Sequence, residues 1–350
     1  MVRDTKLIVL PIEEATQAGE ARRFAAALAA DLGFSETDAG RVAIVVTEAA
    51  GNLAKHAQEG VLVLQPLSHD DARGIEILAI DRGPGMSDPA RCLQDGYSTA
   101  GSPGTGLGSI RRLAHEFELH SLPDAGSVLM ARLWGRAPRT LSAATMLAGG
   151  LSVPVLGEFE CGDAWAVRQR GNESIFLVVD GLGHGILAAE AAAALVRSLD
   201  ESLGRNAPGP VELLERAHGA LRGTRGAAAA IAVVNAAAGT VRFAGIGNIA
   251  ANVVTDGASR SMVSHNGIVG HQMRKLQEFA YPWAPDSVLV LASDGLKTQW
   301  RLDAYPGLAR RHPAVVAGTL WRDFTRGRDD VTVLVARGSA LSGAEGTAGP

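Results

Sequence analysis

Glycine clusters constrain this chain most. Glycine fills 42 of the 350 positions, whereas roughly 25 would be usual at the average frequency of about 7%. These glycines form short groups between apolar segments: Gly83 and Gly85, residues 101–108, residues 181–185, Gly245 and Gly247, and Gly295. Clusters placed in this way are typical of tight or ligand-binding loops inside folded domains, rather than of one flexible linker.

The length predicts two domains, since a domain usually contains about 100–200 residues. The best boundary is residues 135–152, where small residues and Pro138 interrupt any clear periodicity. We therefore expect a first domain over residues 1–134, a linker over 135–152, a second domain over 153–337 and a frayed tail over 338–350.

Charge and cysteine content exclude several classes of protein. The formal net charge is −4 and no dense Lys/Arg block occurs, so neither a nucleic-acid partner nor a membrane partner is expected. The two cysteines, Cys92 and Cys161, form no disulfide framework and no zinc-binding spacing. The apolar run at residues 7–10 is too short for a signal or membrane segment, and we expect a cytoplasmic protein.

The first domain is predicted to be α+β, with helices packed on a sheet. Strands are expected at 6–12, 61–67, 74–80, 117–121 and 127–133, and helices at 15–32, 35–57 and 109–116. The second of these helices carries a line of polar residues, Glu48, Asn52 and His56, at intervals of four that place them on one face. Such a line also occurs on a simple solvated helix face.

Glycine loops beside these elements favour a nucleotide site. The strand at 74–80 runs into Asp81-Arg82-Gly83-Pro84-Gly85, and Gly104-Thr105-Gly106-Leu107-Gly108 precedes a helix. Glycines at a helix N-terminus let backbone N–H groups approach phosphate. The order of these motifs resembles the GHKL (Bergerat-type) nucleotide-binding fold, an α/β sandwich, and the run at 95–108 looks like that of RsbT-type serine/threonine switch kinases.

This resemblance implies a site for ATP and Mg²⁺. It implies that Asp81 holds the adenine amino group, that Gly83 and Gly85 shape the adenine pocket, and that Asn52 ligates Mg²⁺. The phosphate lid would be formed by three glycines, Gly104, Gly106 and Gly108. Glu48 would be the general base for a serine or threonine hydroxyl of a partner protein.

The second domain is predicted to be rich in strands, with two helices outside. Strands are expected at 165–169, 174–179, 228–235, 240–244, 249–254, 287–291 and 331–336, and helices at 186–203 and 211–221. Four aspartates stand at strand ends or beside glycine: Asp163, Asp180, Asp294 and Asp329. A single Asp-Gly pair is usually a turn, but four gathered carboxylates suit Mg²⁺ or Mn²⁺.

This series resembles the SpoIIE-like, PPM-type serine/threonine phosphatases, and its compact form is similar to RsbX-type stress phosphatases. The resemblance implies an αββα sandwich with two Mn²⁺ or Mg²⁺ ions. Asp180 would bridge both ions and act in catalysis, and the Gly181 carbonyl would ligate one of them. Asp294 and Asp329 would complete the second metal site, with Asp163 beside the first.

The two resemblances together predict a bifunctional partner-switching regulator in stress or sigma-factor signalling. STAS-domain antagonists, with a possible sigma factor, are the implied partners, and a homo-oligomer remains open. In the alternative, the first domain binds nucleotide and a partner without phosphorylating it. A scaffold with two silent sites is a third interpretation, which the filled acidic positions oppose.

Overall fold

The computed structural model describes residues 7–69, 71–94, 96, 106–136, 138, 146–203, 208–273 and 275–339. The chain divides into two compact units, Met1–Ala143 and Ala144–Pro350. Among the described helices, none combines the length and apolar character needed to cross a bilayer.

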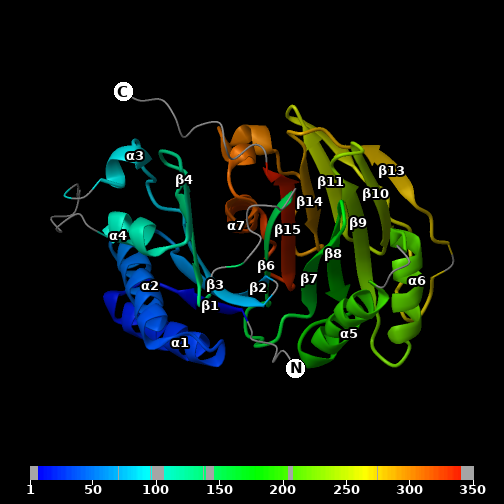
Figure 1. The fold of residues 1–350 in the computed structure, drawn as a ribbon, viewed down its shortest axis with the longest axis horizontal. Helices are drawn as coiled ribbons and strands as arrows, with labels where there is room; N and C mark the ends of the chain where they lie inside the picture. The colour runs from blue at the N-terminus through cyan, green and yellow to red at the C-terminus, as the bar shows by residue number, and fades with distance from the viewer. Residues whose placement is uncertain are drawn as a thin grey trace. The chain divides into compact units, whose positions relative to one another are not determined.

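The first unit is a two-layer α/β sandwich (Figure 1). Its antiparallel sheet has the order β1 (Ile8–Pro11), β2 (Val61–His69), β3 (Ala72–Asp81), β5 (Ser127–Trp134) and β4 (Glu116–Ser121). The helices are α1 (Ala15–Asp31), α2 (Glu36–His56), the short α3 (Pro89–Cys92) and α4 (Gly106–Leu113). Helices α1, α2 and α4 pack against the sheet, which confirms the predicted fold class.

Helix α2 shows how the sequence produces this layer. The hydroxyl of Ser35 accepts a hydrogen bond of 3.1 Å from the Asp38 backbone N–H, so the predicted N-cap is confirmed. The buried side of the helix carries Val42, Val45, Val46, Ala49, Ala50 and Leu53. Because these residues recur at helical spacing, they fix α2 on the sheet and determine where its polar line lies.

The second unit is a sandwich of two five-stranded antiparallel sheets (Figure 1). One sheet has the order β13 (Phe279–Pro282), β10 (Thr240–Ile246), β9 (Ala227–Asn235), β8 (Glu173–Gly181) and β7 (Asp163–Arg170). The other has the order β12 (Ala258–Ser261), β11 (Ala250–Thr255), β14 (Val288–Ala292), β15 (Val331–Gly338) and β6 (Met146–Val153). The predicted αββα class is confirmed, because helices cover both sheets.

Helices α5 (Ile186–Ser202) and α6 (Pro210–Ala220) pack on the first sheet, and α7 (Pro313–Phe324) packs on β6 and β15. Two short 3₁₀ helices, η1 (Leu302–Ala304) and η2 (Leu308–Arg310), precede α7. The sheets enclose one apolar cluster that includes Phe176, Phe243 and Leu291. A second cluster lies between the first sheet and its helices.

The predicted linker, residues 135–152, is wrong for residues 146–152. These residues form most of β6, which pairs along its length with β15. Their glycines serve close packing: a Cβ on Gly149 would clash with Ala314 of α7, and one on Gly150 would lie 2.6 Å from the Val333 carbonyl oxygen. The predicted tail also needs correction at its start, since Gly338 is the last residue of β15.

Candidate active sites

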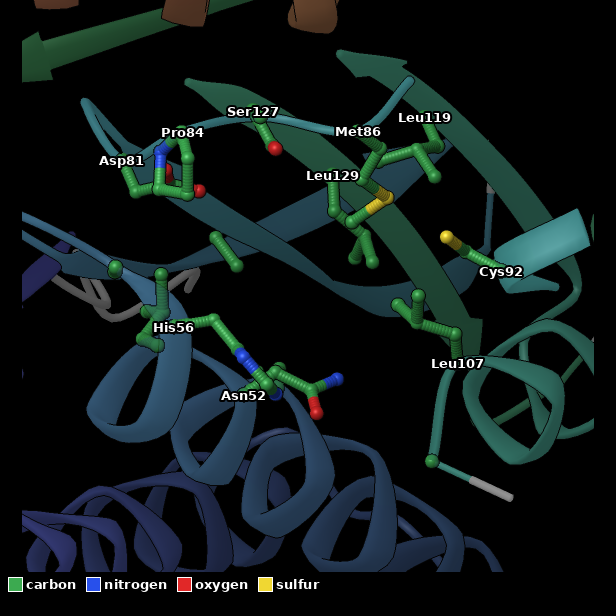
Figure 2. Close-up of a pocket in the computed structure, with 16 residues that line it drawn as sticks. Asn52, His56, Asp81, Pro84, Met86, Cys92, Leu107, Leu119, Ser127 and Leu129 are labelled. Carbon is green, nitrogen blue, oxygen red and sulfur yellow. The ribbon is translucent and has the colours of Figure 1, made fainter. Parts of the chain in front are cut away.

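A cavity of about 210 Å³ opens in the first unit beside the C-terminal half of α2 (Figure 2). Its wall combines apolar side chains from the sheet with a few polar groups, as small-molecule sites usually do. The lining residues are Ala49, Asn52, Leu53, His56, Ala57, Ala79, Asp81, Pro84, Gly85, Met86, Cys92, Gly106, Leu107, Leu119, Ser127 and Leu129.

The loop after β3 is shaped by Asp81 and its glycines. The Gly83 backbone N–H donates a hydrogen bond of 2.7 Å to Asp81 Oδ1. A Cβ on Gly83 would lie 2.8 Å from the His56 carbonyl oxygen, so glycine alone lets the loop pass the end of α2. Gly85 has φ +66°, and a Cβ there would clash with the Leu122 carbonyl oxygen. Asp81 and Gly85 both line the cavity, and their roles toward adenine stay a prediction.

Helix α4 begins at Gly106, three residues earlier than predicted, and ends at Leu113. Its first turn lies against the polar line of α2: a Cβ on Gly106 would be 2.8 Å from Glu48 Oε2 and 3.5 Å from Asn52 Oδ1. A helix N-terminus directed at this point favours an anion. Gly108 is buried within α4, whereas Gly104 and Asp95 lie outside the described residues.

The side-chain amide of Asn52 lies near Gly106, and the described residues leave its buried Nδ2 atom without a hydrogen bond. A buried amide normally has a partner. Asn52 also lines the cavity, whereas Glu48 stands beside Gly106 outside the cavity wall. The arrangement therefore places an acidic and an amide side chain beside the first turn of α4, the end of a helix that favours an anion.

Two further groups line the cavity, of which the sequence marked only His56. His56, the last residue of α2, is exposed and contributes to the wall. Cys92 reaches it from α3, and burial together with the nearby Asp88 raises the pKa of its thiol. Neither belongs to a motif, so no sequence signal marked Cys92; His56 was visible as the last residue of the polar line.

Replacing Gly85 with alanine is expected to lower the free energy of unfolding by about 2–5 kcal/mol. The left-handed backbone costs about 1–2 kcal/mol with a Cβ, and the clash with Leu122 adds about 1–3 kcal/mol. Gly33→Ala is the matched control, because Gly33 has φ +75° with open space around it. Thermal and urea unfolding should show the larger loss for Gly85→Ala; equal losses would contradict the clash.

Four aspartates of the second unit stand at strand ends, as predicted. Asp163 and Asp180 are direct cross-strand partners in β7 and β8. Asp294 follows β14, and Asp329 precedes β15. Asn248 Nδ2 donates a hydrogen bond of 2.7 Å to Asp294 Oδ2 and so fixes that carboxylate.

The carboxylates of this group repel one another. Burial, followed by the charges of Asp294, Asp329 and Asp330, raises the pKa of Asp180 to about 7. Burial and the neighbouring Asp180 also raise the pKa of Asp163 well above its ordinary value. Asp163 Oδ2 is buried and has no hydrogen-bond partner in the described part of the chain. These observations fit a divalent cation, which prefers carboxylate oxygens and would compensate their charge.

Within the described ranges, no three acidic, histidine or cysteine side chains already surround a single ion position. The structure brings Asp163 and Asp180 together and puts Asp294 and Asp329 within electrostatic range of Asp180. Gly181 continues β8, where a Cβ would clash with the Ala188 carbonyl oxygen. Its role as a carbonyl ligand stays a prediction.

Asp330 is an anchoring residue that sequence reasoning did not identify. Its Oδ1 accepts a hydrogen bond of 2.7 Å from Val155 N–H, and its Oδ2 accepts one of 2.6 Å from Gly162 N–H. It thereby ties both ends of the loop between β6 and β7 to the start of β15. The Asp329-Asp330 doublet was visible in the sequence, but the long-range partners of its second member were not.

Two family models match separate parts of this chain. The family model "Histidine kinase-like ATPase domain" matches residues 12–133, and the model "Stage II sporulation protein E (SpoIIE)" matches residues 170–338. The fold and these matches define a protein in which a histidine kinase-like ATPase domain precedes a SpoIIE-type serine/threonine phosphatase domain.

Two individual proteins are each similar to part of this chain. Serine/threonine-protein kinase RsbT of Bacillus subtilis (strain 168) is 34% identical over 116 residues, which are 33% of this chain and 87% of that protein. Phosphoserine phosphatase RsbX of the same organism is 29% identical over 142 residues, 40% of this chain and 69% of that protein. Through its first domain the chain belongs to the RsbT family.

A solved structure is also similar to part of this chain. It is described as "The bacterial stressosome: a modular system that has been adapted to control secondary messenger signaling". The match has a TM-score of 0.51 and 29% sequence identity, and it covers 55% of this chain and 100% of that one.

Proposed function

We propose that this protein is a bifunctional partner-switching regulator with a metal-dependent phosphatase and an ATP-dependent kinase in one chain. The observation that carries the proposal is the cross-strand pair of the buried Asp163 and the half-buried Asp180, in which the unpartnered Oδ2 of Asp163 suits a cation. A purely structural pair of this kind would be costly, because unpaired buried charge destabilises the fold.

In the phosphatase unit, Asp180 and the Gly181 carbonyl would help to hold two Mn²⁺ or Mg²⁺ ions. Asp294 and Asp329 would complete the second position, with Asp163 beside the first. When bound, two such ions supply an activated water and a clamp on the phosphate. Asn248 holds the Asp294 carboxylate in place through its hydrogen bond, and Asp330 holds the loop that carries Gly162.

In the kinase unit, Asp81 would recognise the adenine amino group from the cavity wall, beside Gly83 and Gly85. Asn52 would hold Mg²⁺, and the first turn of α4, with Gly106 and Gly108, would receive the phosphates. Glu48 would accept the proton of the partner's serine or threonine hydroxyl. Phosphoryl transfer needs mainly positioning, charge compensation and such a carboxylate.

The relatives support a proposal for the partner class. One is named as a serine/threonine-protein kinase, one as a phosphoserine phosphatase, and a third belongs to a structure described as a stressosome. We therefore propose STAS-domain antagonists of stress signalling as the proteins on which both units act.

Calorimetric titration of the full chain with ATP and Mg²⁺ tests the nucleotide site. We expect binding by the wild type and a loss of about tenfold or more in Asn52→Ala, since a metal ligand or its support typically contributes about 10–100-fold to affinity. Thr47→Ala, an exposed change on the same helix, should bind like the wild type. Wild-type protein that binds no ATP would eliminate both the kinase and a nucleotide-dependent binding module.

A further inference from the structure

An exposed apolar surface borders the aspartate cluster. Eight large hydrophobic side chains are exposed in the described part of the chain, and five of them lie between residues 156 and 187. We call these five the rim: Leu156, Phe159, Leu182, Ile186 and Leu187. Leu156 is 98% exposed and Phe159 is 89% exposed. Grouped apolar side chains in water mark interaction sites more often than scattered ones do.

The rim is one surface, although its residues come from two segments. Leu156 and Phe159 belong to the loop between β6 and β7, and the other three flank the start of α5. The segments meet where Glu158 Oε1 lies 2.7 Å from His184 Nδ1. A Cβ on Gly185 would also be 3.1 Å from Glu158 Oε2. The loop therefore rests on the segment that leads from Gly181 into α5.

The loop between β6 and β7 is fixed by hydrogen bonds to Asp330, which follows Asp329 of the aspartate cluster. Asp330 binds Val155 at one end of the loop and Gly162 at the other. On the second segment, the Leu182 backbone N–H donates a hydrogen bond of 3.0 Å to the Gly226 carbonyl oxygen. Leu182 directly follows Gly181 in the chain. Since Asp180 directly precedes Gly181, Leu182 lies two residues along the chain from the aspartate cluster.

We propose that the rim binds apolar residues next to the phosphoserine of a protein substrate. This inference rests on the proposed phosphatase function. The polar side chains Glu158 and His184, which lie between the two segments, hydrogen-bond to each other, and the five exposed side chains of the rim are apolar, so the surface suits an apolar segment. Because the loop is fixed at both ends, docking on it loses little conformational entropy.

The test compares two synthetic phosphoserine peptides, identical except that one has leucine and phenylalanine beside the phosphoserine and the other has serine and glycine. The full chain with Mn²⁺ should hydrolyse the apolar peptide with a kcat/KM about tenfold higher, as expected from partial burial of two large side chains. In the double variant Leu156→Ser/Phe159→Ser, the values of kcat/KM for the two peptides should become equal. Hydrolysis of p-nitrophenyl phosphate should stay within about twofold, because that compound carries no peptide to contact the rim.

Val263→Ser is the matched control, since Val263 is 50% exposed in the same unit outside the rim; it should keep the tenfold preference. A wild type without preference, or a double variant that keeps it, would overturn the docking site. If the double variant keeps the preference but loses a wild-type dimer in sedimentation, the rim binds a second copy instead. Failure of the wild type to hydrolyse even p-nitrophenyl phosphate would overturn the phosphatase proposal itself.

Discussion

Asp180→Asn is expected to reduce Mn²⁺-dependent hydrolysis of p-nitrophenyl phosphate by about 10³-fold. Metal ions stabilise such transition states by several kcal/mol, and about 1.4 kcal/mol corresponds to a factor of ten in rate. Asparagine keeps the volume of the side chain but removes the charge that would bridge the ions. Phosphate release is measured with Mn²⁺, and again with a chelator, which should abolish wild-type activity.

The same variant should remain folded. Burial and three neighbouring carboxylates already raise the pKa of Asp180 to about 7, so a neutral side chain relieves repulsion in the metal-free protein. We expect Mn²⁺ to raise the melting temperature of the wild type but not of Asp180→Asn, because only the wild type binds it. Asp303→Asn, which alters an exposed aspartate paired with Arg301, is the control. Full turnover by Asp180→Asn would contradict the metal assignment.

The sequence was most informative where local patterns determine structure. The apolar runs predicted β8, β9 and β15 nearly to their ends, and Ser35 identified the start of α2. The interval of four between Glu48 and Asn52 predicted a shared face, and the contact of both with Gly106 agrees with it. These features depend on periodicity and capping, which neighbouring residues specify.

Features that depend on distant partners were not predictable. Strand β6 contains two glycines and no strong β-former run, and it exists because β15 pairs with it and α7 packs closely on it. Helix α7 lacks a standard N-cap residue: His312 caps it by accepting from the Ala314 N–H. Asp330 acts on residues more than 160 positions away. Such contacts arise only from tertiary packing.

Glu48→Gln is expected to reduce phosphate transfer from ATP to a partner by about 10²–10⁴-fold, the usual contribution of a general base. The amide keeps the size of the side chain beside Gly106, so ATP binding measured by calorimetry should be unchanged. The measurement is radiolabel transferred from ATP to purified STAS-domain proteins. The proposed phosphatase in the same chain would remove that label, so the assay is made in the Asp180→Asn background.

Comparing the wild type, Asp180→Asn and Asp180→Asn/Glu48→Gln distinguishes an active kinase from a domain that only binds nucleotide. If both activities are present, label accumulates with Asp180→Asn, is lost with Asp180→Asn/Glu48→Gln, and reaches a lower level with the wild type. A nucleotide-dependent binding module would bind ATP equally in all three proteins and label none of them. Label that persists in the double variant would contradict the role of Glu48 while leaving the kinase itself in place.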